Sequence, residues 1–320
     1  MTLQTLNHSY LYTYKFDYHH SELCKLESRQ IFDVEERNKV LFSNIHVDPS
    51  ISPFIKNRLE ILSSSETFVE LLKSIQQQNI VVEGFKAEYL NLEGDATSPE
   101  ERNEKLKDVG CSIVGIPNFE LPSITYAVCT YEGIWCFGVL VEAKSDWRKH
   151  KQKPCSFSNS ICMIIAKTLV SIASKGNKTK ALLDACCGVG TVLLEGCVSE
   201  FNIEGSDINL KASNHAKENL EYYNYQAQVL CADIKDVSKA YDAIIIDLPY
   251  NLYSHSTDEI TLHIIESAAQ LTNRTVIVSI SDIELLIKQS GLKITDFCTV
   301  KKRGKSTFTR NIWVCVKDGE

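Results

Sequence analysis

The chain has 320 residues, of which 44% are hydrophobic, and its formal net charge at pH 7 is -7. This length and apolar content favour two domains with cores of their own. The acidic balance argues against a protein that coats nucleic acid by bulk electrostatics, so local basic patches would have to bind any nucleic-acid partner. No run in the sequence approaches the roughly 18 apolar residues that a membrane-spanning helix needs.

The cysteines and the first residues bear on location and on metal binding. The opening MTLQTLNHSYLY is too polar for a signal or transit peptide, so we expect a cytoplasmic protein. Twelve cysteines are present, but none form a CxxC pair, and Cys186 and Cys187 are the closest neighbours. We therefore expect most thiols to be small buried hydrophobic groups, and we predict no metal site.

The amino-terminal half carries no catalytic motif and begins with alternating helical and extended patterns. The elements expected in order are a strand at 10–16, a helix at 21–32, a strand at 42–47, a helix at 55–62, a helix at 66–77 and a strand within 85–95. The prolines at 49 and 53 predict a turn before the helical pattern at 55–62.

A well-marked helix follows, with Ser98 as its cap, Pro99 at its first position and Gly110 after its end. Strands are expected at 122–131 and 134–143, joined by a turn at Glu132–Gly133. The pattern predicts an α+β module over residues 1–144, with helices packed on one face of a small antiparallel sheet.

Residues 145–159, SDWRKHKQKPCSFSN, are basic and polar and predict a linker to a second domain at 160–320. A solvated loop is an equal alternative. In the functional interpretation, Arg148 and Lys149 contact a phosphate backbone, and Phe157 packs near a cofactor where the chain enters the second domain.

The second domain begins with a helix at 160–174, after which strands and helices alternate to the end of the chain. Regular βα alternation that ends in two strands predicts an α/β fold with a doubly wound sheet, whose last strand is antiparallel.

Two stretches of this domain are expected to carry its chemistry. ALLDACCGVGT (181–191) predicts a buried strand that ends at Asp184, a tight turn with Gly188 and Gly190, and a helix N-terminus. IIIDLPYN (244–251) predicts a second buried strand that stops at Asp247, because Pro249 cannot continue the pairing. Both strand ends would lie at the carboxyl edge of one sheet.

Three acids, Asp184, Asp207 and Asp233, end three successive strands. Open α/β sheets bind ligands at such strand ends. Asp207 follows the glycines by about twenty residues, a spacing that suits an acceptor for ribose hydroxyls. A single acid in such a place is more often a helix cap, but three acids in register with the glycine turn favour a cofactor site.

The glycine turn lacks the third glycine of a dinucleotide site, since TVL follows GVG, and the sequence offers no other cradle for a pyrophosphate. S-adenosylmethionine, which has an adenosine and no phosphate, fits better. Asp233 would then accept a hydrogen bond from the adenine amino group, and Ile208 or Ile234 would flank the ring. The expected cofactor-binding residues are Phe157, Asp184, Cys186, Gly188, Gly190, Thr191, Asp207, Ile208, Asp233 and Ile234.

In order and spacing, DACCGVGT, GSDIN, CADI and DLPYN resemble class I methyltransferases that modify exocyclic amino nitrogens, whose hallmark is Asp/Asn-Pro-Pro-Tyr/Phe. FKAEYLNLEG, a helix and ITYAVCTYEGIWCFGVLVEAKSD resemble the second half of a THUMP domain, an RNA-binding module. With both resemblances combined, the chain is similar to THUMP-containing RNA guanine-N2 methyltransferases. The resemblance implies a Rossmann-like methyltransferase domain after a THUMP-like domain, S-adenosyl-L-methionine as cofactor, and RNA, most of all tRNA, as partner.

The resemblance also implies the catalytic residues. The guanine amino protons would donate to the Asp247 carboxylate and the Leu248 carbonyl, which localises the nitrogen lone pair toward the methyl group. Pro249 would fix the turn, and Tyr250 would stack on the base. The chain departs from the family at Leu248, where proline is usual, and at Ala185, where a proline commonly follows the first acid.

The stretch KKRGKSTFTR places basic residues around a glycine turn between the last two strands. Beside an active site they are expected to contact RNA phosphates, with a solvated hairpin as the alternative. These residues are Lys301, Lys302, Arg303, Lys305 and Arg310.

Other functions remain compatible with these motifs. Adenine N6 and the amide nitrogen of a protein glutamine are alternative methyl acceptors. A non-enzyme, an RNA-binding protein with a vestigial cofactor site, is favoured by Leu248 alone. The sequence does not exclude an activating subunit.

Overall fold

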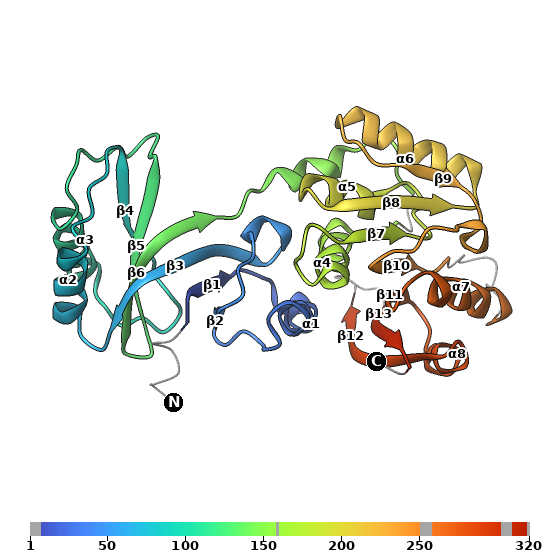
Figure 1. The fold of residues 1–320 in the computed structure, drawn as a ribbon, viewed down its shortest axis with the longest axis horizontal. Coiled ribbons are helices and arrows are strands. Elements are labelled where there is room, and N and C mark those ends of the chain that lie inside the picture. The colour runs from blue at the N-terminus through green and yellow to red at the C-terminus, as the bar shows by residue number, and fades with distance from the viewer. Residues whose placement is uncertain (1–7, 158–159, 250–257, 302–308, 319–320) are drawn as a thin grey trace. The chain divides into compact units, whose positions relative to one another are not determined.

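The computed structural model describes residues 8–157, 160–249, 258–301 and 309–318 (Figure 1). The chain divides into two compact units by its internal contacts. Unit one comprises Met1–Lys15, Glu35–Ser50 and Phe54–Ala143, and unit two comprises Phe16–Val34, Ile51–Pro53 and Lys144–Glu320. Residues 16–34 thus cluster with the second unit although they lie far ahead of the linker expected at 145–159.

Unit one is built on a six-stranded sheet with the strand order β2-β1-β3-β6-β5-β4. Its strands are β1 (Tyr10–Tyr14), β2 (Val40–Ser43), β3 (Ile55–Ser65), β4 (Phe85–Tyr89), β5 (Ile124–Tyr131) and β6 (Ile134–Glu142). Helices α2 (Phe68–Gln77) and α3 (Pro99–Cys111) pack over a core that includes Leu71, Val109 and Phe137. Strands β4 and β5 are parallel because α3 forms a crossover between them.

The helix predicted at 55–62 is wrong, because these residues belong to β3. Ile55, Leu59 and Leu62 have helical spacing, which explains the prediction. However, β3 pairs with β1 on one side and with β6 on the other, and Leu62 is 42% exposed. Cross-strand pairing in the middle of a sheet here overrides the local periodicity.

The other predicted elements of unit one are present with shifted ends. The Ser98 side chain and Glu101 form a capping box at the start of α3, as the sequence predicts, but the helix continues through Gly110 to Cys111. Glu132 and Gly133 form the turn between β5 and β6, both with positive φ. Helix α2 begins after Thr67, whose side chain caps it, rather than at Glu66.

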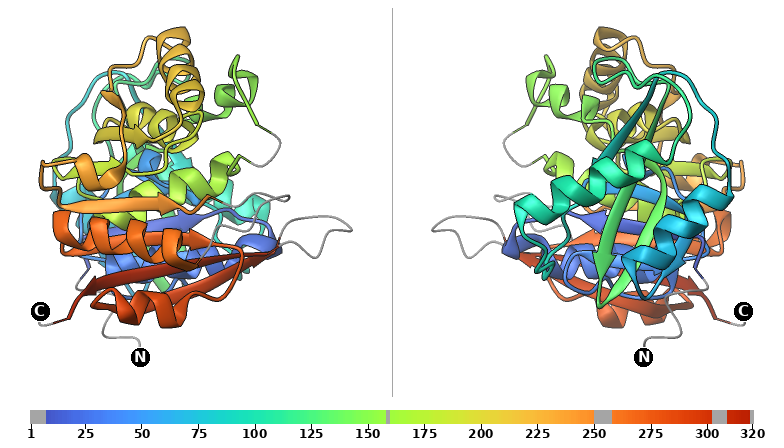
Figure 2. Two further views of the ribbon diagram at one scale, coloured as in Figure 1. Left: turned by 90° about the vertical axis from the view of Figure 1, so that its right-hand side faces the viewer. Right: turned by 90° about the vertical axis from the view of Figure 1, so that its left-hand side faces the viewer.

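Unit two is a Rossmann-like α/β fold with a seven-stranded sheet in the order β12-β13-β11-β10-β7-β8-β9 (Figures 1 and 2). Its strands are β7 (Ala181–Asp184), β8 (Asn202–Asp207), β9 (Val229–Cys231), β10 (Ala243–Asp247), β11 (Arg274–Ser279), β12 (Leu292–Lys301) and β13 (Thr309–Lys317). The sheet is doubly wound, and β13 is antiparallel to both neighbours, which confirms the prediction. The strand order reverses between β7 and β10.

Helices and short 3-10 segments flank this sheet. They are α1 (Ser21–Phe32), η4 (Asp146–Gln152), α4 (Met163–Ser174), α5 (Thr191–Val198), α6 (Leu210–Tyr222), η5 (Ile234–Asp236), α7 (Asp258–Leu271) and α8 (Glu284–Gln289). Within the described part of the chain, no helix is long and apolar enough to cross a membrane.

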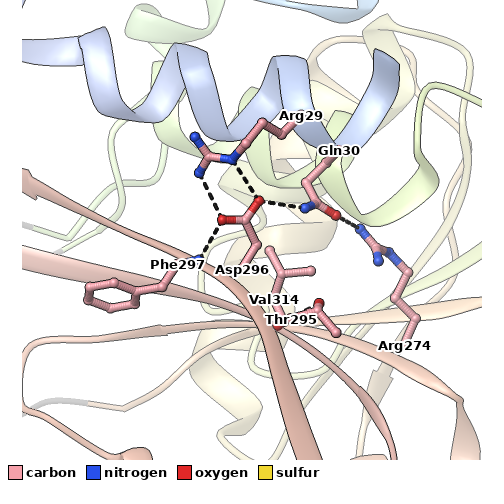
Figure 3. Close-up of polar contacts among 7 residues, drawn as sticks. All are labelled: Arg29, Gln30, Arg274, Thr295, Asp296, Phe297 and Val314. Carbon is pink, nitrogen blue, oxygen red and sulfur yellow. Dashed lines mark hydrogen bonds and ion pairs between the residues drawn. The ribbon is translucent and has the colours of Figure 1, made fainter. Parts of the chain in front are cut away.

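Helix α1 is joined to β12 by a cluster of polar contacts (Figure 3). Asp296 accepts from Arg29 Nε at 3.0 Å, from Arg29 Nη2 at 2.8 Å and from Gln30 Nε2 at 2.7 Å. Gln30 Oε1 in turn accepts from Arg274 Nη2 of β11 at 2.8 Å. Burial alone would raise the pKa of Asp296, but the hydrogen bonds from Arg29 and Gln30 hold it below its usual value.

A second contact of α1 is the carboxylate of Glu27, which is fully buried. It accepts from the hydroxyl of Ser171 on α4 and from Ser52 Oγ at 2.5 Å. Burial raises the pKa of Glu27 to about 7. Helix α1 is therefore a packed part of unit two, although most of unit one follows it in the chain.

We expect the substitution Asp296→Ala to lower the free energy of unfolding by about 1–3 kcal/mol, because it leaves donors of Arg29 and Gln30 without their carboxylate. Urea unfolding of the full chain measures this loss. Glu22→Ala is the matched control, since it removes an exposed carboxylate of α1 that pairs with Lys25 and should change stability by less than about 0.5 kcal/mol. Equal effects of the two substitutions would contradict the interpretation.

Candidate functional site

A cavity of about 410 Å³ lies at the carboxyl edge of the sheet in unit two, where β10, β7 and β8 end. The registers of the strands fix how far along the strand direction each of its aspartates lies. Asp184 lies level with Ile245 of β10 and with Gly205 of β8. Asp247 and Asp207 each lie two residues further along, about 7 Å above Asp184 on either side. Asp184 therefore forms the floor of the cavity, and the other two acids flank it.

The Asp184 side chain is 1% exposed, and neither carboxylate oxygen has a hydrogen-bond partner among the described residues. Burial raises the pKa of Asp184 well above its usual value, and the nearby charges of Asp247 and Asp207 add to this effect. A buried carboxylate without a partner is costly unless a ligand supplies one.

Asp247 ends β10 at the same cavity, and its Oδ1 atom also lacks a partner among the described residues. Burial raises the pKa of Asp247 to about 7, an effect that the positive charge of Arg310 opposes. Arg310 comes from β13 and is only 7% exposed. Its charge therefore acts on the site from inside the protein.

The glycine turn is held by Asp207. The Gly188 N–H donates to Asp207 Oδ2 at 2.8 Å, and the Asn209 N–H donates to Asp207 Oδ1 at 2.8 Å. Gly188 and Gly190 have φ values of 52° and 78°, which favour glycine. A Cβ atom on Gly190 would lie 3.1 Å from Cβ of Ala216 on α6. Each oxygen of Asp207 keeps a lone pair for a ligand.

Three carboxylates around one cavity suit a ligand that carries positive charge. The glycine turn also allows close approach to the loop, and Thr191 begins α5 at the cavity wall. S-adenosylmethionine, with a sulfonium and an ammonium group and no phosphate, fits this set of residues.

Comparison with known proteins agrees with the geometry. Residues 149–281 match the family described as the methyltransferase small domain. This part of the chain is a methyltransferase domain. The match confirms the enzyme class and the cofactor, S-adenosyl-L-methionine, that the sequence predicts for it.

Two curated relatives are tRNA (guanine(10)-N2)-dimethyltransferases. The protein of Methanothermobacter thermautotrophicus is 27% identical over 115 residues, which cover 35% of this chain and 34% of the relative. The protein of Pyrococcus abyssi is 29% identical over 151 residues, which cover 44% of this chain and 45% of the relative. The chain thus matches less than half the length of either. A crystal structure of TrmN from Thermus thermophilus covers 96% of this chain and 99% of its own, with 15% identity and a TM-score of 0.48.

Most of the predicted site residues of the methyltransferase domain line the cavity. From the expected cofactor set these are Phe157, Asp184, Cys186, Gly188, Thr191, Asp207 and Ile208, and from the catalytic set Asp247, Leu248 and Pro249. Tyr250 lies outside the described residues. Gly190 shapes the turn as the N-cap of α5 without lining the cavity.

The two residues expected near the adenine in CADI, Asp233 and Ile234, do not line the cavity. Asp233 Oδ1 accepts from the Lys235 N–H at 3.1 Å, and the Asp233 carboxylate lies 3.6 Å from His263 Nε2. Ile234 is 4% exposed and belongs to the hydrophobic core. Of the two isoleucines proposed to flank the ring, only Ile208 borders the cavity, with 72% of its surface exposed.

The basic residues expected to meet RNA divide into exposed and buried ones. Arg148 and Lys149 are exposed on η4, and Lys301 is exposed at the end of β12. Arg310 is buried beside the site rather than at the surface. Lys302, Arg303 and Lys305 lie outside the described residues.

Sequence reasoning missed the contacts that fix the predicted linker. His150 is fully buried; its Nδ1 atom lies 2.8 Å from Glu195 Oε1 of α5, and its Nε2 atom lies 3.1 Å from the Tyr225 hydroxyl. The side chain of Asn219 is also fully buried and binds this segment. A polar residue on the apolar face of the α6 sequence was the available signal for Asn219, whereas nothing local marks His150.

We expect Gly190→Ala to weaken cofactor binding about tenfold or more, because the left-handed φ costs about 1–3 kcal/mol and the methyl group presses on Ala216. Calorimetric titration with S-adenosylhomocysteine measures the change. Gly94→Ala is the matched control, since Gly94 in unit one has a φ of 86° and an added methyl group there would meet no atom within 4 Å. It should lower stability and leave the dissociation constant unchanged; a similar loss of binding would contradict the role of the turn.

Proposed function

We propose that this protein methylates an exocyclic amino nitrogen of RNA, with N2 of a guanine in tRNA as the acceptor. The observation that carries the proposal is the position of Asp247, which ends β10 at the cavity with an oxygen unpartnered among the described residues and directly precedes Leu248 and Pro249. A carboxylate followed by a backbone carbonyl at a strand end offers two acceptors for the two protons of one amino group.

The cofactor supplies an electrophilic methyl group on a sulfonium. The chain's own contribution is to orient the acceptor amine and to direct its electrons. The Asp247 carboxylate and the Leu248 carbonyl accept hydrogen bonds from the amine, which opposes delocalisation of its lone pair into the ring. Pro249, whose φ is fixed, supports the turn at this strand end.

The environment of Leu248 supports its part in this proposal. Its side chain is 5% exposed in the hydrophobic core, and its N–H donates to the Val278 carbonyl at 3.1 Å. This bond extends the pairing of β10 with β11 by one residue, and a proline could not make it. Packing and hydrogen bonding thus restrain the residue where the ring of proline would otherwise do so.

The choice of guanine N2 and tRNA rests on the relatives, which are named as tRNA (guanine(10)-N2)-dimethyltransferases. The sequence resemblance of unit one to a THUMP domain supports RNA as the substrate. That resemblance applies to the elements β4, α3, β5 and β6, in which β4 and β5 form a parallel pair.

Nucleoside mass spectrometry of tRNA from cells with and without the gene tests the proposal. We expect N2-methylguanosine to be lost with the gene, restored by the wild-type chain and not restored by Asp247→Ala. If a different methylated base changes, the acceptor is not guanine. If labelled methyl groups appear only in protein, the substrate is not RNA.

The protonation of Asp247 predicts a pH dependence. Only the ionised carboxylate accepts the hydrogen bond of the amine with a full negative charge. The pKa of Asp247 is about 7, so the carboxylate becomes ionised as the pH rises through neutrality. We expect kcat/KM to fall about tenfold per pH unit below 7 and to level off above it. Asp247→Asn should remove this limb of the profile, and a profile that the substitution leaves unchanged would contradict the assignment.

A further inference from the structure

The side-chain amide of Asn219 on α6 joins two separate backbone segments. Its Oδ1 atom accepts from the Cys155 N–H at 2.9 Å. Its Nδ2 atom donates to the Cys155 carbonyl at 2.9 Å and to the Val189 carbonyl at 2.8 Å. The residue is fully buried; its hydrogen bond to Val189 is buried as well, and the two to Cys155 are partly buried.

Both segments reach the cofactor cavity. Val189 lies between the two glycines of the turn, and Val189 itself lines the cavity. Cys155 lies two residues before Phe157, which lines the cavity with Ser160 and Ile161. The amide therefore fixes the distance between the glycine turn and the chain segment at the edge of the cavity.

Two further contacts come from the same face of α6. The ring of His215 lies 5.6 Å from the ring of Phe157, and Ala216 packs against Gly190. Residues 215, 216 and 219 are spaced to share one helical face. Ala212 of α6 lines the cavity directly, whereas these three residues do not and contact its walls from behind.

An amide is the group that this position requires. The Cys155 N–H needs an acceptor, whereas the two carbonyl oxygens need donors, and among side chains of this size only asparagine offers both. An aspartate would keep the acceptor but would place a carboxylate oxygen against two carbonyl oxygens. An apolar residue would leave buried backbone groups without partners.

We propose that Asn219 is a positioning residue for the cofactor: it holds the segment at Cys155–Phe157 against the glycine turn, and thereby sets the affinity for S-adenosylmethionine. The inference rests on the assignment of this cavity as the cofactor site. It adds a residue that does not line the cavity and that the motifs of the sequence do not contain.

The test compares Asn219→Asp with Asn214→Asp in the full chain, titrated calorimetrically with S-adenosylhomocysteine. Asn214 lies on the same helix and is exposed, so the chemical change is the same. We expect Asn219→Asp to raise the dissociation constant at least tenfold and Asn214→Asp to leave it within twofold. In methylation assays, Asn219→Asp should raise KM for the cofactor while kcat at saturating cofactor stays within about threefold.

A second pair of variants separates positioning from general stability. Asn219→Ala removes the three hydrogen bonds without the added charge and should weaken binding to a smaller extent. Ile287→Ala, at a fully buried residue of α8 outside the cavity, should lower the melting temperature and leave the dissociation constant unchanged. If both Asn219 variants bind as the wild type does, the proposal is overturned. If the wild type itself does not bind, the cofactor assignment fails instead.

Discussion

The burial of carboxylates at one edge of a sheet is the constraint on which the rest of unit two depends. Three strands end side by side, and each ends in an aspartate: Asp184 at the floor of the cavity and Asp207 and Asp247 above it on either side. Burial raises the pKa of Asp184, and the negative charges of Asp247 and Asp207 raise it further. A doubly wound sheet brings such residues together at the point where its strand order reverses, and a cationic ligand can offset the charge that results.

Groups around the cavity offset the negative charge of two of the three carboxylates. Asp207 is neutralised in part by two backbone N–H groups, and Arg310 places a buried positive charge near Asp247. Asp184 has no such compensation among the described residues. The least compensated group therefore lies deepest in the cavity, where a ligand's charge would have the greatest effect because the surroundings are least polarisable.

Local signals in the sequence were sufficient for the elements that carry the site. A strand that ends in an acid and a glycine turn that begins a helix depend on neighbouring residues, and the structure has them. Helix α1 has the bounds that its sequence predicts, Ser21–Phe32, but its place against β12 depends on Asp296, which lies 267 residues from Arg29 in the chain. The strand β3 and the contacts of Asn219 could not be predicted for the same reason, because partners distant in the chain determine them.

The departure at Leu248 bears on whether the site is a working one. A proline at this position would restrict the backbone conformation through its ring. The absence of that proline was the single feature that favoured a vestigial site. Leucine instead gives the backbone an N–H, which bonds to Val278, and a side chain that packs in the core. Both interactions restrain the same residue whose carbonyl follows Asp247. A degenerating site would be expected to lose such restraint, whereas this one has replaced it, so the substitution argues for a retained constraint on the carbonyl.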